Sequence, residues 1–134
     1  MNKLLFIEPN YFTYSTNLKL LRVELTTTYT KIDFGYQPFD GQKEVKKIKI
    51  RKEAYLSLLD EKKKFKLVRT SNMPIAPKQH IFKTAMDWLF FSLYFEPVPV
   101  KYCDLNLIEN EVIAESDFNF ISIELNKKKQ LEIK

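Results

Sequence analysis

Residues 21–36, LRVELTTTYTKIDFGY, decide the fold because apolar and polar residues alternate within them. Leu21, Val23 and Leu25 alternate with polar neighbours, and the alternation resumes at Ile32 and Phe34 after a run of threonines. A period of two places successive side chains on opposite faces of a β-strand, whereas a helix repeats every 3.6 residues. The stretch therefore predicts strands with one apolar face each.

The same alternation continues along the chain. It is clear over residues 47–51, and it returns in Cys103–Glu109 and Phe118–Leu125. Trp88–Glu96 (WLFFSLYFE) is apolar at nearly every position, which predicts a central strand buried on both faces. Thr, Val, Ile, Tyr and Phe, which suit a pleated surface, dominate these segments. We expect a mostly β fold, an antiparallel β-sandwich of about seven to nine strands.

Three other segments are less regular. Asp60–Lys63 is polar and predicts a hairpin tip between two apolar stretches. Residues 52–59 (KEAYLSLL) allow a helix by propensity, but the flanking alternation favours a strand with a bend. Residues 71–87 begin as a long connection with two prolines, and we leave open one short helix near 78–87.

The length of 134 residues suits one domain. We assign residues 1–126 to a single β-sandwich domain, with 1–17 as an N-terminal arm and 127–134 as a solvated basic tail. The first ten residues lack the long apolar stretch of a secretory signal, and no segment has the roughly 20 apolar residues of a membrane-spanning helix. If Met1 is the natural start, the expected location is the cytoplasm.

Scarce residue types exclude several kinds of site. The two glycines, at 35 and 41, cannot form a GxxxxGK[ST] phosphate loop or a GxGxxG turn. A structural zinc site takes four Cys or His ligands, and the chain has one Cys and one His. An intramolecular disulfide is impossible for the same reason. We therefore expect no metal and no cofactor.

The strand segments resemble an immunoglobulin-like β-sandwich domain that precedes thioredoxin-like domains in bacterial envelope proteins, and that also occurs alone in uncharacterised proteins. The matching segments run in order over about residues 20–126: Val23–Thr26, Lys64–Leu67, Phe91–Pro99 (FSLYFEPVP), Asp104–Glu109 (DLNLIE) and Phe118–Leu125 (FNFISIEL). A Trp-rich segment expected near 36–45 is missing, and no CxxC-bearing domain follows. The resemblance implies an accessory or binding module and carries over no catalytic residue.

The candidate catalytic residues lack the partners that catalysis needs. His80 has no nucleophile or carboxylate at a readable spacing, so an exposed polar residue is the favoured interpretation. Cys103 follows Lys101 closely, but a half-buried, inert thiol is commoner than a reactive one. An acidic loop contains four further residues, which are Glu109, Glu111, Glu115 and Asp117. That loop has no glycine for a calcium turn, so we expect it to be solvated, and we expect no enzyme.

The formal net charge of +5 is concentrated in two segments, which are residues 43–52 and the tail 127–134. Residues 43–52 hold six Lys and Arg against one Glu. On a strand, Lys47, Lys49 and Arg51 would project from one face and, with Lys46, could contact phosphates. Tyr36 and Phe39 precede them and could stack on bases. The alternative interpretation, which we favour, is that these lysines protect an exposed edge strand from pairing.

Tyr11, Phe12 and Tyr14 lie outside any clear alternation. They either pack an arm across the sandwich or form an exposed contact patch. We therefore expect a non-enzymatic module that contacts a protein partner or a second copy of itself, within a larger bacterial assembly. Binding of nucleic acid or another anionic ligand through residues 43–52 is the alternative.

Overall fold

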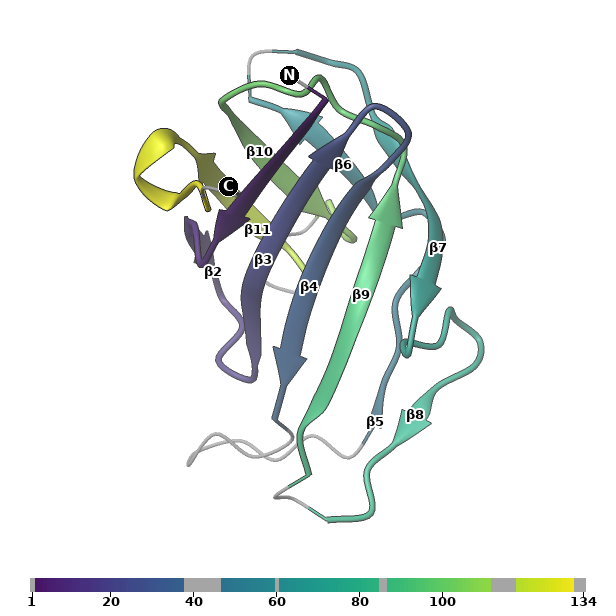
Figure 1. Ribbon diagram of the computed structural model, residues 1–134. Helices are drawn as coiled ribbons and strands as arrows, with labels where there is room; N and C mark the ends of the chain where they lie inside the picture. The colour runs from purple at the N-terminus through teal and green to yellow at the C-terminus, as the bar shows by residue number, and fades with distance from the viewer. Residues whose placement is uncertain (1, 38–46, 60, 85–86, 112–117, 132–134) are drawn as a thin grey trace.

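A computed structural model describes residues 2–37, 47–59, 61–84, 87–111 and 118–131 (Figure 1). The elements are β1 (Lys3–Ile7), β2 (Asn10–Thr13), β3 (Leu18–Thr26), β4 (Thr30–Tyr36), β5 (Lys47–Ile48), β6 (Tyr55–Leu58), β7 (Phe65–Ser71), β8 (His80–Ile81), β9 (Leu89–Phe95), β10 (Cys103–Ile108), β11 (Phe120–Leu125) and the 3₁₀ turn η2 (Lys127–Lys129).

Nine of the strands form one antiparallel sheet in the order β1-β3-β4-β9-β7-β6-β10-β11-β2, and β5 pairs with β8 separately. In Figure 1 the sheet folds over, so that β1, β3, β4 and β9 lie in front of β6, β10 and β11. The predicted mostly β, antiparallel fold is confirmed. The two layers are continuous through hydrogen bonds, which makes the sheet a half-barrel.

Strand β7 carries the sheet from one layer to the other. Its first residues pair with β6, where Leu56 lies opposite Phe65, and its later residues pair with β9. The register shifts between Leu67 and Arg69, at the crossing point. An irregularity of this kind bends a strand and increases its twist, which lets one strand serve both layers.

The alternating residues of β3 and β4 build the core between the layers. Val23, Ile32 and Phe34 are fully buried. The ring of Phe34 stacks on Phe91 in the same layer, with centroids 5.2 Å apart, and meets the edge of Phe120 in the opposite layer at 5.5 Å. Each such side chain stabilises the fold by about 1.5–3 kcal/mol through burial. The sequence pattern therefore predicted the core face correctly at these positions. It was wrong at Leu21, because the register of β3 shifts between Leu20 and Arg22 and places Leu20 in the core instead.

The predicted hairpin is confirmed by the antiparallel pairing of β6 with β7, and Asp60, the first residue of its predicted tip at 60–63, lies outside the described residues. The strand with a bend predicted for 52–59 is confirmed as well, because a turn at Lys52 and Glu53 leads into β6. The short helix left open near 78–87 is wrong: the described residues of that segment contain β8 and no helix. Pairing with β5 and burial of Phe82 against Tyr36, with ring centroids 5.5 Å apart, hold the segment extended.

Strand β9 is central, but the prediction that both of its faces are buried is wrong. Leu89, Phe91 and Leu93 point into the core, whereas Phe90 is 60% exposed. The layer that contains β9 has one core face and one outer face, as antiparallel sheets commonly do. The apolar residues on the outer face therefore form a surface feature.

Described segments near both ends of the chain pair with strands of the sheet. The proposed arm contains β1 and β2, which are the two ends of the strand order. Lys127 and Lys128, at the start of the proposed tail, are exposed, but Gln130 bridges to Phe6, and the Leu131 backbone N–H donates to the Leu5 carbonyl at 2.7 Å. The segment after β11 thus covers the outer side of β1.

Candidate functional site

The structure separates the three aromatic residues that we predicted as a partner site. Tyr11 packs inward, with its ring 4.9 Å from that of Phe120, and its hydroxyl accepts from the Leu20 backbone N–H at 3.4 Å. Phe12 and Tyr14 are 52% and 61% exposed and pack edge to face at 5.0 Å. One residue of the predicted site therefore anchors the segment, and two form an exposed aromatic pair.

The position of β2 in the sheet leaves this aromatic pair accessible. Strand β2 pairs with β11 and ends the strand order of the described sheet. It is four residues long, and its register with β11 shifts between Ile121 and Glu124. Short, irregular edge strands pair poorly with other strands. Contacts at this edge would therefore rest mainly on the side chains of Phe12 and Tyr14.

Among the described residues of the basic segment, 47–52, the structure has one strand, β5, and one further bridge from Ile50 to Ile75. Ile48 and Ile50 are buried, and Lys49 and Arg51 are exposed, as the alternation predicted. Lys46 and Phe39 lie outside the described residues. Tyr36, considered above as a base-stacking residue, is fully buried in the core. The predicted stacking of a base on Tyr36 is therefore wrong.

A groove of about 790 Å³ brings Arg51 together with two of the predicted acidic residues. The Arg51 backbone N–H donates to Oε2 of Glu109 at 2.8 Å. The Tyr55 hydroxyl donates to Oε1 of Glu111 at 2.9 Å, and Lys64 Nζ lies 4.5 Å from the Tyr55 ring. Burial and this hydrogen bond raise the pKa of Tyr55, so its phenol stays a donor. Glu115 and Asp117 lie outside the described residues.

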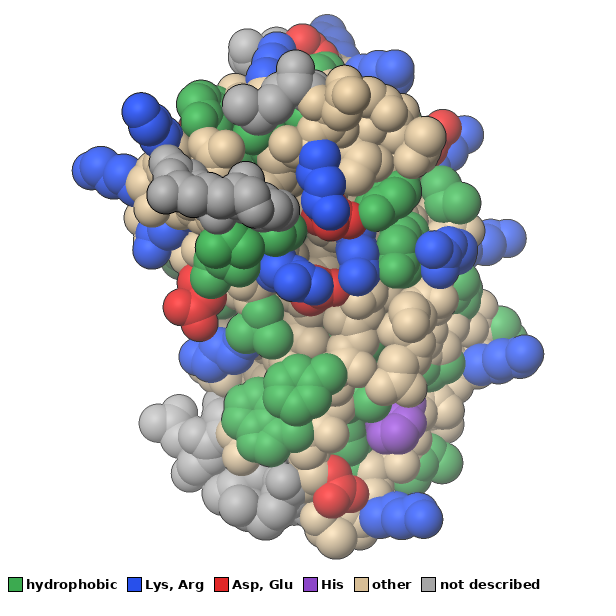
Figure 2. Space-filling model, viewed as in Figure 1, with side chains coloured by type: hydrophobic (Ala, Val, Ile, Leu, Met, Phe, Trp, Pro, Cys, Tyr) green, Lys and Arg blue, Asp and Glu red, His purple; other side chains and the backbone are tan. Residues whose placement is uncertain are grey.

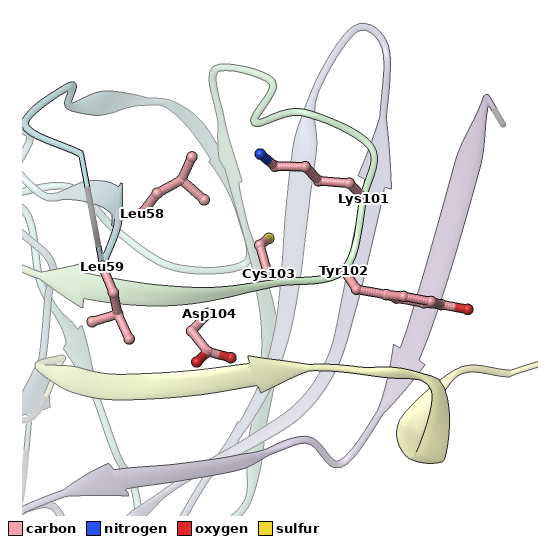
Figure 3. Close-up of a pocket in the computed structure, with 6 residues that line it drawn as sticks. All are labelled: Leu58, Leu59, Lys101, Tyr102, Cys103 and Asp104. Atoms are coloured by element: carbon pink, nitrogen blue, oxygen red, sulfur yellow. The ribbon is translucent and has the colours of Figure 1, made fainter.

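Cys103 lines a smaller pocket of about 340 Å³ at the start of β10. Figure 3 shows the side chains of Cys103 and Asp104 on opposite sides of that strand, and Lys101 on the loop that precedes it. The strand start predicted at this cysteine is confirmed. The inert thiol stays a prediction.

His80 lies in β8 rather than in a loop, with its ring 4.8 Å from that of Phe82. In the part of the chain that the structure describes, no group of three His, Cys, Asp or Glu residues could hold a metal ion. Nor does a helix there have the length and apolarity to cross a membrane.

Sequence reasoning missed the most exposed aromatic pair of the front layer. Trp88 and Phe90 are 49% and 60% exposed, and their rings are parallel to within 7° at 5.9 Å. Phe90 lies opposite Gly35 in the β4–β9 ladder. Figure 2 shows a large hydrophobic patch low on this face. The signal in the sequence is the apolar run at 88–96, which predicts a strand buried on both faces and so gives no sign of an exposed pair.

The same face carries a network of charges above the aromatic pair (Figure 2). Arg22 Nε lies 2.8 Å from Oδ2 of Asp33, and Lys3 Nζ lies 2.9 Å from Oε2 of Glu24. The Tyr29 hydroxyl also donates to Glu24, at 2.6 Å. Burial acts to raise the pKa of Glu24, but the hydrogen bonds from Tyr29 and Lys3 outweigh it and leave the pKa below its ordinary value of 4.5.

With this geometry in place, comparison with known proteins adds no relative, because no family model, curated protein or solved structure matches the chain.

Proposed function

We propose that this protein is a non-enzymatic β-sheet module that contacts a protein partner through Phe12 and Tyr14. The observation that carries the proposal is the exposed, mutually packed pair of these rings, with Phe12 in the terminal strand β2 and Tyr14 directly after it. The predicted resemblance to an immunoglobulin-like accessory domain of bacterial envelope proteins is in keeping with such a role, within a larger assembly.

The physical case rests on what aromatic residues contribute to interfaces. Exposed aromatic side chains are enriched at protein interfaces, and a few of them supply most of the binding energy. Tyr11 fixes the segment against Phe120, so the neighbouring rings of Phe12 and Tyr14 are held in place before binding. A prepositioned pair loses less side-chain entropy on association than two free side chains would.

Site-specific photo-crosslinking tests the proposal. A benzoylphenylalanine at position 12, in the full chain and in the cells that produce it, is expected to give one discrete adduct. The matched control carries the same group at Leu59, an exposed residue beyond β6. Tyr14→Ala should weaken the adduct from position 12. An adduct with a second copy of this chain would identify self-association. Equal adducts from both positions, or none from position 12, would overturn the proposal.

Binding of an anionic ligand by the basic segment is the second candidate function. The observation that favours it is that Lys49 and Arg51 are both exposed while Ile48 and Ile50 are buried, which places the two cations on one side of the segment. The double variant Lys49→Gln/Arg51→Gln should weaken binding of a polyanion such as heparin at low salt. The control, Lys127→Gln/Lys128→Gln, removes the same charge elsewhere. Equal loss in both variants would contradict a site at residues 49–51.

A further inference from the structure

We propose that the outer face of β3, β4 and β9 binds single-stranded nucleic acid, with bases stacked on Trp88 and Phe90. This site shares no residue with the contact surface at β2 or with the basic segment 43–52. It combines a stacking platform, formed by the rings of Trp88 and Phe90, with a set of cations. The fold brings these residues together from five neighbouring strands. Those two components are the ones that sequence-tolerant single-strand binders combine.

The platform exists because a glycine lies beneath it. A Cβ on Gly35 would stand 3.1 Å from Cε1 of Phe90 and 3.5 Å from Cζ3 of Trp88, so both rings rest against the backbone of β4. The two rings are nearly parallel, and each is about half exposed. The inner side of the pair covers the glycine, and the outer side is open to solvent. Flat, exposed aromatic rings of this kind stack on unpaired bases of any sequence.

The ladder register places cations in rows that lead away from the platform. Lys19 lies opposite Gly35 in the first row, and Arg22 lies opposite Asp33 in the next. In the row beyond, Lys31 lies opposite Tyr94, and the Arg69 guanidinium lies 3.6 Å from the centroid of the Tyr94 ring. The strand rise makes this track about 14 Å long.

The charge balance of these rows selects an anionic ligand. The rows contain five cations and two carboxylates. The cations are Lys19, Arg22, Lys31, Arg69 and, through its ion pair with Glu24, Lys3; the carboxylates are Glu24 and Asp33. Each carboxylate is already matched by a cation, so the excess is positive. Figure 2 shows basic and acidic side chains gathered in the middle of this view, above a hydrophobic patch. An apolar protein surface would use the rings but leave the cations without a partner, whereas a nucleic acid strand satisfies both.

Trp88 is the only tryptophan in the chain, so its fluorescence reports directly on the platform. We would titrate the full-length protein with oligo(dT) of about 12 nucleotides, a length within the usual range for such sites. Stacking is expected to quench the emission of Trp88. If three phosphates are contacted, affinity should fall by about twenty-fold between 50 and 200 mM salt. No quenching at 50 mM salt, or quenching that salt does not weaken, would overturn the proposal.

Two variants separate stacking from charge. Phe90→Ala should weaken binding by about five- to 150-fold, the range found for loss of one stacked base, while the control Leu59→Ala should leave it unchanged. Because Phe90→Ala uncovers Gly35 and could unsettle the sheet, Lys19→Gln provides a second test on an exposed side chain. It should reduce the slope of log affinity against log salt by about 0.7.

The last measurement compares the affinity for single-stranded and double-stranded nucleic acid. A duplex of the same sequence should bind less tightly than the single strand, because its paired bases cannot reach the rings. Equal binding of duplex and single strand, or unchanged affinity of Phe90→Ala for oligo(dT), would contradict stacking on this face. Failure here would leave the crosslinking result at Phe12 unaffected, since that contact lies on a different strand.

Discussion

Gly35 of β4 lies directly opposite Phe90 of β9, and the Phe90 ring covers the point at which a Cβ of residue 35 would stand. This single pair explains why two aromatic rings lie exposed on the outer face of β4 and β9. Because residue 35 has no side chain, the rings of Phe90 and Trp88 approach the backbone and lie parallel to each other. An aromatic residue that covers a cross-strand glycine is a known device for stabilising a sheet, and here it also creates an exposed aromatic pair.

Gly35→Ala should displace both rings without unfolding the protein. The new Cβ would lie 3.1 Å from the Phe90 ring, closer than a relaxed contact, so the ring must shift by a few tenths of an ångström. Alanine also loses less backbone entropy than glycine on folding, by about 0.5–1 kcal/mol, which offsets the crowding. We expect a changed emission spectrum of Trp88 and a midpoint of urea unfolding close to that of the parent. An unchanged spectrum would contradict the close packing of the pair on Gly35.

The sequence was sufficient to predict the β class and the core, but it could not locate this face. Alternation identified Val23, Ile32 and Phe34 as core residues because it depends only on local geometry. The apolar run 88–96 carried no such information, since Trp88 and Phe90 look like core residues until the partner strand is known. The register that pairs Phe90 with a glycine arises only when β4 and β9 meet.

The groove near Arg51 shows that the sequence also could not predict which polar residues the strand pairing brings together. Arg51 and Glu109 are 58 positions apart, and their hydrogen bond depends on how β6 and β10 pair. Both residues were identified as notable from the sequence, but in separate segments with separate roles. In the structure the Arg51 backbone N–H donates to the Glu109 carboxylate, a contact that neither residue type announces in the sequence. Long-range pairing of this kind has no local signature.

Asn119 is the buried polar residue whose loss should cost the most stability. Its side-chain oxygen accepts from the backbone N–H of Glu109 at 2.7 Å and of Asn110 at 3.1 Å, and its amide donates to the Asn110 carbonyl at 2.6 Å. Asn119→Ala leaves these groups without that partner, at a cost of about 2–4 kcal/mol in the free energy of unfolding. Urea denaturation measures the change. A loss under about 1 kcal/mol would show that water replaces the side chain without cost.

Replacing phenylalanine by alanine at a buried and at an exposed position tests the packing between the two layers. Phe34→Ala removes a fully buried ring that contacts Phe91 and Phe120, and it should destabilise the protein by about 3–5 kcal/mol. Phe12→Ala removes the same atoms from an exposed position and should change stability by less than about 0.5 kcal/mol. Similar losses for both variants, measured by thermal or urea unfolding, would contradict the layered core.

The Glu24 cluster predicts how stability depends on pH. The pKa of Glu24 is lower in the folded protein than its ordinary value of 4.5, so the unfolded chain takes up the proton first as the pH falls. The stabilisation by the carboxylate is therefore complete above about pH 5 and disappears as the pH falls through the folded-state pKa. Glu24→Gln should cost about 1–2 kcal/mol at pH 7 and progressively less below about pH 4.5.

Tyr29 makes this prediction specific to the cluster. Its hydroxyl donates to Glu24 at 2.6 Å, and this hydrogen bond raises the pKa of Tyr29, so the phenol keeps its proton throughout the acid range. Tyr29→Phe alone should destabilise the protein at pH 7, but it should add little when Glu24 is already glutamine, because the charge-assisted bond is gone. Urea unfolding of the two single variants and the double variant at about pH 7 and pH 3 gives the coupling free energy. A coupling that is equal at both pH values would show that the carboxylate charge of Glu24 is not its source.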